Sequence, residues 1–280
     1  MFMEKNMFIN VLHDSHAKGF AVGAFNIFNG QTARGVLNAA NRVKTPVILQ
    51  VSAGTVKRLG VKALGGMINA LKADAPYGLA LHLDHCRDTE LAKACILNGW
   101  DAVMMDFSHF SMEENVAKTK EVVDFAHQYG VAVEGEVGLV LGVEEDIVST
   151  VEKLAEEDET LDFIARTGVD AIAPAVGTAH GVYKSEPKLN FNLVESLSKK
   201  ETSVVIHGGT GLTDDVYRKL VDLGASKINI STAIKHAFAK GVKACYELDI
   251  PASPMKADEI IEKEVEEVAY RLITLFRGDK

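Results

Sequence analysis

Three histidines of this chain stand at the ends of short apolar runs, next to acidic or glycine residues. His85 ends LHLDH, His180 lies in GTAHG, and His207 begins HGGTG. Taken singly, each would be read as a histidine whose ring is satisfied by a hydrogen bond. Their shared placement predicts instead that the rings converge. Three imidazoles with one open position are a ligand set of catalytic Zn²⁺, so we predict one such ion per subunit. Five other histidines lack this placement and receive no role: His13, His16, His109, His127 and His236.

Two segments have the composition of phosphate-binding loops. HGGTG begins at His207, and NIST begins at Asn229. Glycine lets backbone N–H groups approach an anion closely, and parallel α/β barrels commonly bind phosphate after their last two strands. These glycines could instead only form tight turns, but two such loops in adjacent positions favour phosphate. Lys184, four residues after His180, could add a positive charge.

Acidic residues also follow the apolar runs. Asp106 ends one run, and Glu134 and Glu136 end the next. Asp84 directly precedes His85, where a carboxylate can exchange a proton with a substrate or can orient a metal-binding histidine. The residues alone leave both roles of Asp84 open.

These groups need a scaffold that brings the ends of several runs together. Eight apolar runs recur along the chain, each followed by a longer segment, which is the pattern of repeated strand–helix units. The predicted strands are AVGAF from Ala21, PVILQV from Pro46, GLALHL from Gly78, DAVMM from Asp101, VAVEGE from Val131, DAIAPA from Asp170, SVVIH from Ser203 and KINI from Lys227. Helical periodicity lies between them, for example at 32–44, 89–97, 113–129, 160–167 and 214–223.

Eight parallel units predict an α/β fold, a single (β/α)8 TIM barrel, whose functional groups sit at the carboxyl ends of the strands. An open doubly wound sheet is the alternative. No linker of Pro, Gly or Ser divides the chain, so residues 1–280 are predicted to be one domain. The charged segment 257–277 predicts a C-terminal helical extension that covers a barrel end or contacts another subunit.

Composition narrows the classes of partner. The formal charge is 30 − 39 = −9, which argues against nucleic acid or an anionic membrane as the main partner. The first ten residues lack the apolar core of a signal peptide, and no run approaches the length of a membrane span. Three widely spaced cysteines suit reduced thiols. A folded, soluble, cytoplasmic protein is expected.

The sequence resembles the class II, zinc-dependent fructose- and tagatose-bisphosphate aldolases over nearly its whole length. The resemblance rests on motifs that are weak singly and highly specific together: AFN, PVILQ, LHLDH, EENVAKTKEVV, EGEVG, GTAHGVYK, HGGTG and KINIST. It implies cleavage of a ketose 1,6-bisphosphate to dihydroxyacetone phosphate and an aldehyde such as glyceraldehyde 3-phosphate. It also suggests a homodimer or homotetramer.

The resemblance implies roles for individual residues. It makes His85, His180 and His207 the Zn²⁺ ligands, Asp84 the proton donor in cleavage, and Asp106 and Glu136 a possible second metal position. Glu144, in the loop 138–156, would be the second acid/base, although the residues alone would be read as a solvated charge run on a mobile loop. The implied substrate contacts are Gly181, Lys184, Gly208, Gly209, Thr210, Asn229, Ile230, Ser231 and Thr232.

The chain departs from the family pattern at three positions. Cys86 and Leu141 replace residues that are generally glycine, and Ala233 stands where an acidic residue is common. The aldehyde half of the substrate therefore stays open, and an aldolase for a variant ketose 1-phosphate is credible. A metal-dependent sugar-phosphate isomerase or epimerase would use the same barrel and loops, and a noncatalytic sugar-phosphate sensor would keep the fold alone. Cys86 is favoured as a packing residue over a redox group.

Overall fold

The computed structural model describes residues 6–144, 147–149, 153–181, 187–248 and 253–278, and its centre is a closed barrel of parallel strands. The eight strands are β1 (Val22–Asn26), β2 (Val47–Ser52), β3 (Leu79–Cys86), β4 (Ala102–Met105), β5 (Ala132–Val137), β8 (Ala171–Pro174), β10 (Ser203–Ile206) and β11 (Lys227–Ile230). The ring closes because β1 pairs in parallel with both β2 and β11. The predicted TIM barrel is confirmed, and the open-sheet alternative is excluded.

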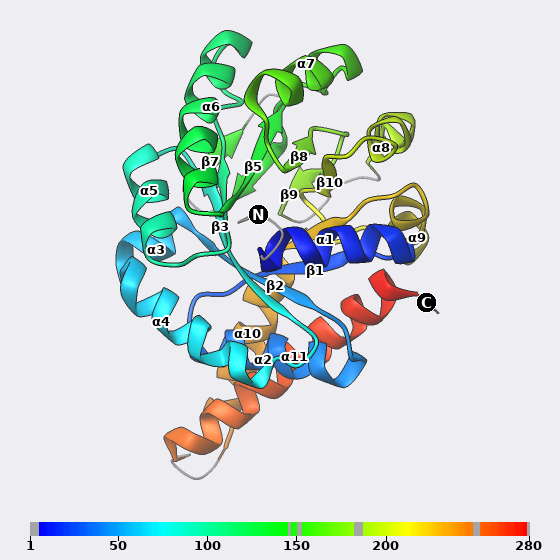
Figure 1. The fold of residues 1–280 in the computed structure, drawn as a ribbon. Helices are drawn as coiled ribbons and strands as arrows, with labels where there is room; N and C mark the ends of the chain where they lie inside the picture. The colour runs from blue at the N-terminus through cyan, green and yellow to red at the C-terminus, as the bar shows by residue number, and fades with distance from the viewer. Residues whose placement is uncertain (1–5, 145–146, 150–152, 182–186, 249–252, 279–280) are drawn as a thin grey trace.

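Helices surround this barrel in the described part of the chain (Figure 1). They are α1 (Met7–Lys18), α2 (Gly30–Val43), α3 (Ala53–Leu59), α4 (Val61–Leu71), α5 (Thr89–Leu97), α6 (Met112–Gln128), α7 (Glu157–Thr167), α8 (Phe191–Ser198), α9 (Asp214–Asp222), α10 (Thr232–Tyr246) and α11 (Pro254–Arg277). Side-chain caps begin several of them. In α6, Ser111 and Glu114 form a reciprocal capping box. None of the described helices combines the length and apolarity that a bilayer crossing requires.

Helix α1 closes the end of the barrel at which the strands begin. The sequence patterns did not predict this helix. Small side chains point into this end, among them Ala80, Ala102 and Ala132, and they form one buried cluster with Phe8 and Leu12 of α1. Alanine is too short to fill a barrel interior, so the aromatic ring of Phe8 occupies the space. The fully buried ring of His82 stacks on Phe8 with 5.0 Å between ring centroids.

A second, small sheet lies at the opposite end of the barrel, where the strands end. Its strands are β6 (Leu141–Glu144), β7 (Ile147–Ser149) and β9 (Ala179–His180), in the order β7-β6-β9. Gly142 pairs with His180, and a Cβ on Gly142 would lie 2.2 Å from the His180 carbonyl oxygen. Only glycine permits this approach. Part of the loop predicted to be mobile is therefore a strand paired to the segment that holds a candidate metal ligand.

The C-terminal extension is a helical hairpin of α10 and α11, which reaches out from the barrel (Figure 1). The predicted extension began at residue 257, whereas the helix begins at Pro254, after Ser253 caps it. Two glycines let α11 pack closely. A Cβ on Gly35 of α2 would lie 2.7 Å from the Glu262 carbonyl oxygen, and one on Gly241 of α10 would lie 2.7 Å from the Ile261 Cα.

Candidate active site

The three predicted metal ligands lie together at the carboxyl ends of the barrel strands. His85 belongs to the end of β3, His180 to β9, and His207 follows β10. The ring centroids of His85 lie 4.6 Å from those of His207 and 5.1 Å from those of His180. His85 Nε2 is 2.9 Å from His207 Nδ1. One nitrogen of each ring lies within 4.8 Å of the other two, which is a span that a single metal ion can bridge.

The protonation of these rings suits a cation. Burial lowers the pKa of His180 and of His207 well below the ordinary value, and the neighbouring imidazoles lower it further. Neutral imidazole keeps a lone pair for a metal, whereas imidazolium has none. The donor set therefore fits a divalent cation of the kind that prefers imidazole nitrogen.

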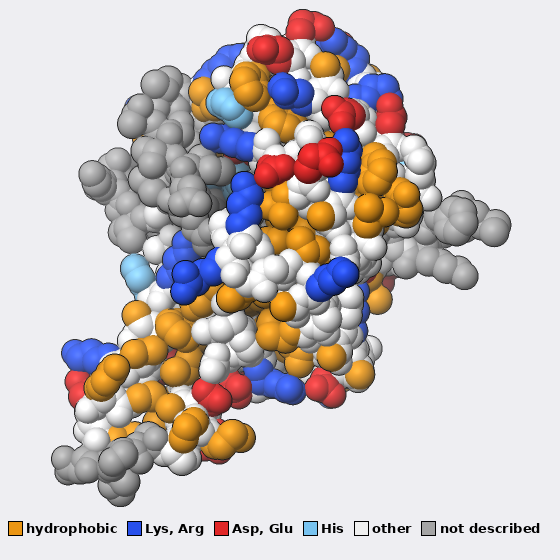
Figure 2. All heavy atoms as spheres, turned by 90° about the vertical axis from the view of Figure 1, so that its left-hand side faces the viewer, with side chains coloured by type: hydrophobic (Ala, Val, Ile, Leu, Met, Phe, Trp, Pro, Cys, Tyr) orange, Lys and Arg blue, Asp and Glu red, His pale blue; other side chains and the backbone are white. Residues whose placement is uncertain are grey.

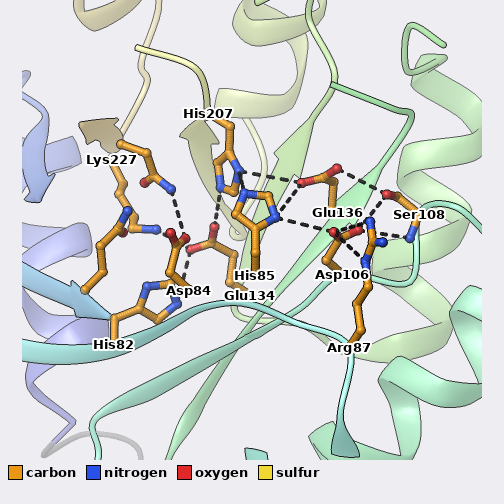
Figure 3. A network of polar contacts seen from close by, with 12 residues as sticks. His82, Asp84, His85, Arg87, Asp106, Ser108, Glu134, Glu136, His207 and Lys227 are labelled. Carbon is orange, nitrogen blue, oxygen red and sulfur yellow. Dashed lines mark hydrogen bonds and ion pairs between the residues drawn. The ribbon is translucent and has the colours of Figure 1, made fainter. Parts of the chain in front are cut away.

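A buried ion pair fixes the orientation of His207 (Figure 3). Glu134 Oε1 lies 2.8 Å from His207 Nε2, and Glu134 Oε2 accepts a hydrogen bond of 2.7 Å from Lys227 Nζ. Glu134 and Lys227 are fully buried. With Nε2–H donated to the carboxylate, His207 Nδ1 is the acceptor nitrogen. The sequence patterns pointed to Glu134 without giving it a role. They missed Lys227, because nothing in the strand KINI indicated that its lysine side chain points into the barrel.

The predicted second metal position, formed by Asp106 and Glu136, adjoins both His85 and His207, and Glu136 Oε2 lies 3.6 Å from His207 Nδ1. His85 Nδ1 is 3.5 Å from Asp106 Oδ2 and 3.8 Å from Glu136 Oε2. Burial and the charge of Asp106 raise the pKa of Glu136 to about 8. Burial also opposes ionisation of Asp106, but His85, Arg87 and Ser108 outweigh it and hold the pKa of Asp106 well below its usual range. Arg87, which sequence reasoning did not single out, donates to Asp106 Oδ2 from Nε at 3.2 Å and from Nη2 at 2.9 Å.

Asp84 is fully buried and is held by two amides. Asn26 Nδ2 donates to Asp84 Oδ2 at 2.7 Å, and Asn229 Nδ2 lies 3.4 Å from Asp84 Oδ1. Gln50 Nε2 in turn donates to Asn26 Oδ1 at 2.7 Å. Two amide donors fix the orientation of the carboxylate. Asn26 and Gln50 end AFN and PVILQ, so the motifs contained them, but no spacing rule linked them to Asp84.

A small open pocket, called the cavity below, lies beside His180. Its lining contains most of the predicted substrate contacts: Gly181, Gly208, Gly209, Thr210, Asn229, Ser231 and Thr232, with Lys235 in addition. Close backbone contacts explain the glycine pair, since a Cβ on Gly208 would lie 2.5 Å from the Ala179 carbonyl oxygen. Ile230, predicted with these residues, has its side chain in the hydrophobic core and is not among the lining residues.

The amino end of α10 contributes to this cavity. Thr232 is its first residue, and a helix amino terminus favours an anion because its first N–H groups lack partners within the helix. Ser231 Oγ is buried and makes no hydrogen bond with the described part of the chain. Lys235 lines the same cavity one turn along α10. Lys235 was missed because it lies beyond the NIST segment, where no motif marked it.

The remaining predicted positions are Lys184, Glu144, Cys86 and Ala233. Lys184 lies outside the described residues, and of Glu144 only the backbone, at the end of β6, is described. Cys86 is fully buried, and burial raises the pKa of its thiol to about 11, which agrees with a packing role. Ala233 packs against the hydrophobic core.

Comparison with known proteins decides the family. The family model described as fructose-bisphosphate aldolase class-II matches residues 6–279. The chain belongs to this family. Class II aldolases are metal-dependent lyases, so the chain is a carbon–carbon lyase whose site contains a histidine group able to hold a metal. This result does not favour the isomerase alternative.

Individual relatives agree with this assignment to the class II aldolases. The chain is 40% identical over 237 residues to a fructose-bisphosphate aldolase of Geobacillus stearothermophilus, with 83% of each chain covered. It is 39% identical over 240 residues to a sulfofructosephosphate aldolase of Alkalicoccus urumqiensis, covering 84% of this chain and 83% of that one. The crystal structure of the YdjI aldolase from Escherichia coli K12 is similar with a TM-score of 0.85 and 31% identity over 96% of each chain.

Proposed function

We propose that this class II aldolase reversibly cleaves a ketose 1,6-bisphosphate of the fructose or tagatose type to dihydroxyacetone phosphate and an aldehyde such as glyceraldehyde 3-phosphate. One catalytic Zn²⁺ per subunit is held by His85, His180 and His207. The observation that carries the proposal is the position of this histidine group, which lies between a buried carboxylate, Asp84, and a glycine-lined cavity that suits a phosphate.

The cavity binds the phosphate of the dihydroxyacetone phosphate half. The glycines of HGGTG bring backbone close to the ligand, while the amino end of α10 and the Ser231 hydroxyl supply donors. The positive charge of Lys235, which lines the cavity, attracts an anionic ligand. Lys184 belongs to the same proposal from the family pattern. Anchoring the phosphate there holds the sugar carbons beside the three histidines and converts binding energy into orientation.

Zn²⁺, when bound, supplies Lewis acid chemistry that stabilises negative charge developing on the substrate oxygens. Asp84 exchanges the proton of the C4 hydroxyl as the C3–C4 bond breaks. Its amide contacts with Asn26 and Asn229 hold the carboxylate in one orientation for this transfer. Glu144 protonates the carbon that the aldehyde leaves, since its strand β6 is paired to β9, which holds His180.

Asp106 and Glu136 act as partners of His85 in this proposal, and the second metal position is taken up below. Residues 1–280 act as one domain in the cytoplasm, with a sugar phosphate as substrate and neither nucleic acid nor membrane as partner. The unit is a homodimer or homotetramer formed through the hairpin of α10 and α11. Exposed Tyr246, Leu248 and Met255 support this, because apolar side chains gathered at the end of a projecting arm are typical of a contact surface. Figure 2 shows hydrophobic side chains along the arm.

A variant ketose 1-phosphate is the second candidate substrate. The relative named sulfofructosephosphate aldolase is as similar to this chain as the fructose-bisphosphate aldolases are. Ala233 also stands where an acidic residue is common in the family. A neutral residue next to the phosphate loop repels a second anionic group less.

A coupled assay for dihydroxyacetone phosphate tests the function. Fructose and tagatose 1,6-bisphosphates and a sulfofructose phosphate are compared, with chelator and after Zn²⁺ is restored. We expect chelator-sensitive cleavage of at least one substrate. Asp84→Asn should lower kcat about 10² to 10⁴-fold while keeping its metal content. Asp88→Asn is the matched control, because Asp88 caps α5 outside the site and asparagine caps equally well. Absence of cleavage by Zn²⁺-loaded protein would reject the ketose phosphate assignment.

A further inference from the structure

His85 is shared by two groups that could each hold a metal ion. One group consists of His85, His180 and His207, and the other of His85, Asp106 and Glu136. The two nitrogens of the ring point to different groups. Nε2 lies 2.9 Å from His207 Nδ1, whereas Nδ1 lies 3.5 Å from Asp106 Oδ2. The second group, called the carboxylate group below, is defined by Asp106, Glu136 and His85.

A neutral imidazole offers one lone pair, because its other nitrogen carries the proton. If His85 gives the Nε2 lone pair to the three-histidine group, Nδ1–H faces Asp106 and Glu136 and cannot bind a second ion there. If Nδ1 binds a metal in the carboxylate group, Nε2 is lost to the histidines. The two groups therefore compete for His85, and something in the chain must decide between them.

Arg87 lies at the carboxylate group (Figure 3). Its Nε and Nη2 both donate to Asp106 Oδ2, while the Ser108 hydroxyl donates to Asp106 Oδ1 at 2.7 Å. Both oxygens of this buried carboxylate thus have donors already. The Ser108 hydroxyl also lies 3.2 Å from Glu136 Oε1. A divalent cation would have to displace the guanidinium or sit beside its charge, which repels it.

We propose that Arg87 is a positioning residue that assigns His85 to the three-histidine group, by filling the carboxylate group with a cation of its own. Each chain then holds one metal ion in one place. Arg87 touches no substrate in this account. It acts through Asp106, which receives the Nδ1–H side of His85. The inference rests on the proposed metal site and predicts that the second metal position is closed in this protein.

Binding of Co²⁺, followed by its visible absorption and by metal analysis, tests the proposal without an activity assay. His180→Ala removes a ligand of the three-histidine group only, so it should lose Co²⁺ in the wild-type background. Arg87→Met opens the carboxylate group, so the double variant Arg87→Met/His180→Ala should bind Co²⁺ again. Its spectrum should be weaker than that of the wild type, because an oxygen-rich site favours higher coordination. Adding Asp106→Asn should abolish this binding.

Controls separate charge from general damage. Arg87→Lys keeps a cation at Asp106 and should leave His180→Ala unable to bind Co²⁺. Arg218→Met removes an arginine that pairs with Asp215 on the surface, and it should rescue nothing. Thermal unfolding of every variant checks the fold. Arg87 is partly exposed, which lets methionine be accommodated.

The outcomes are distinct. If Arg87→Met/His180→Ala binds Co²⁺ no better than His180→Ala, the proposal is overturned. It is also overturned if His180→Ala alone keeps Co²⁺ through Asp106, because the carboxylate group is then open with Arg87 in place. A wild-type chain that binds Co²⁺ at the histidines but cleaves no ketose phosphate would reject the proposed function, whereas regained Co²⁺ binding in Arg87→Met/His180→Ala would still support this inference.

Discussion

Lys227 is a lysine with no solvent exposure, and the buried carboxylate of Glu134 lies 2.7 Å from its ammonium. Burying two charges is costly, and such a pair rarely adds net stability over an apolar pair of the same shape. The pair is better explained by what Glu134 does with its other oxygen, which holds His207. Lys227 allows a charged carboxylate to lie behind His207, the proposed metal ligand.

Lys227→Met should therefore damage both stability and metal binding. It leaves the Glu134 charge buried without its cation, and breaking a buried pair on one side costs about 3–5 kcal/mol of unfolding free energy. We also expect Zn²⁺ affinity to fall about 10 to 100-fold, the usual effect of losing support behind a metal ligand. Urea unfolding and a competitive chelator titration measure the two effects.

The double variant Lys227→Met/Glu134→Gln distinguishes positioning from packing. It removes both charges, so most of the lost stability should return. Zn²⁺ affinity should stay low, because the amide is a weaker partner of His207 Nε2 than the carboxylate. Full recovery of affinity together with stability would mean that the pair only maintains the fold.

At the scale of elements, α11 depends on the absence of side chains beneath it. Gly35→Ala would place a methyl group 2.7 Å from the Glu262 carbonyl oxygen and 2.9 Å from Val265 Cβ. Backbone cannot move aside cheaply, so we expect a loss of about 1–3 kcal/mol in urea unfolding. Gly66→Ala is the control, because no atom lies within 4 Å of the added Cβ in α4. It should stabilise by about 0.5–1 kcal/mol. Equal effects of the two substitutions would contradict this packing.

A histidine–aspartate pair ties α6 to the barrel and makes its contribution depend on pH. His127 Nε2 lies 3.0 Å from Asp170 Oδ2, which also accepts from the Val133 N–H at 2.8 Å. The hydrogen bond with Asp170 raises the pKa of His127, while partial burial opposes the rise. The raised pKa means that the protonated ring is the form stabilised in the fold. This stabilisation is complete below the unfolded pKa of about 6.5 and is lost as the pH rises through the folded value.

His127→Gln should consequently cost more at pH 5.5 than at pH 9. The ring is partly exposed, so we expect a difference of only about 0.5–1 kcal/mol between the two conditions. Urea unfolding at both pH values measures it. His13→Gln, at an exposed position of α1, serves as the control for replacing a histidine. A cost of His127→Gln that does not change with pH would rule out the charged pair.

At the scale of the whole molecule, the arm formed by α10 and α11 carries large apolar side chains into solvent. Tyr246 is 86% exposed and Met255 is 71% exposed. If the arm joins subunits, the mass in solution should be a multiple of 30.3 kDa. Tyr246→Glu/Met255→Glu should then shift the protein to monomer in light scattering, because charges at a hydrophobic contact are costly to bury. Leu97→Glu, at an exposed position of α5, should leave the mass unchanged. An unchanged mass in the arm variant would exclude this contact.

The sequence by itself determined the barrel and the set of histidines. Each of the eight strands coincides with an apolar run of the sequence. The carboxyl ends of parallel strands meet at one end of the barrel, so the positions of His85 and His207 at strand ends predicted that they lie together. The repeat of apolar strand and amphipathic helix is a local pattern, and a local pattern can be recognised in a single sequence. Helix α1 was missed because it precedes the first strand and so lies outside the pattern in which each strand is followed by a helix.

Only the tertiary structure decided which side chains meet across the barrel. Asn26 reaches Asp84 from 58 residues away, and Lys227 reaches Glu134 from 93 residues away. Arg87 contacts Asp106 because β3 and β4 are neighbours whose ends lie level. No periodicity encodes such pairs, since each depends on strand register and side-chain direction together. The same physical reason left Lys235 unpredicted, because its place in the cavity is set by where α10 begins.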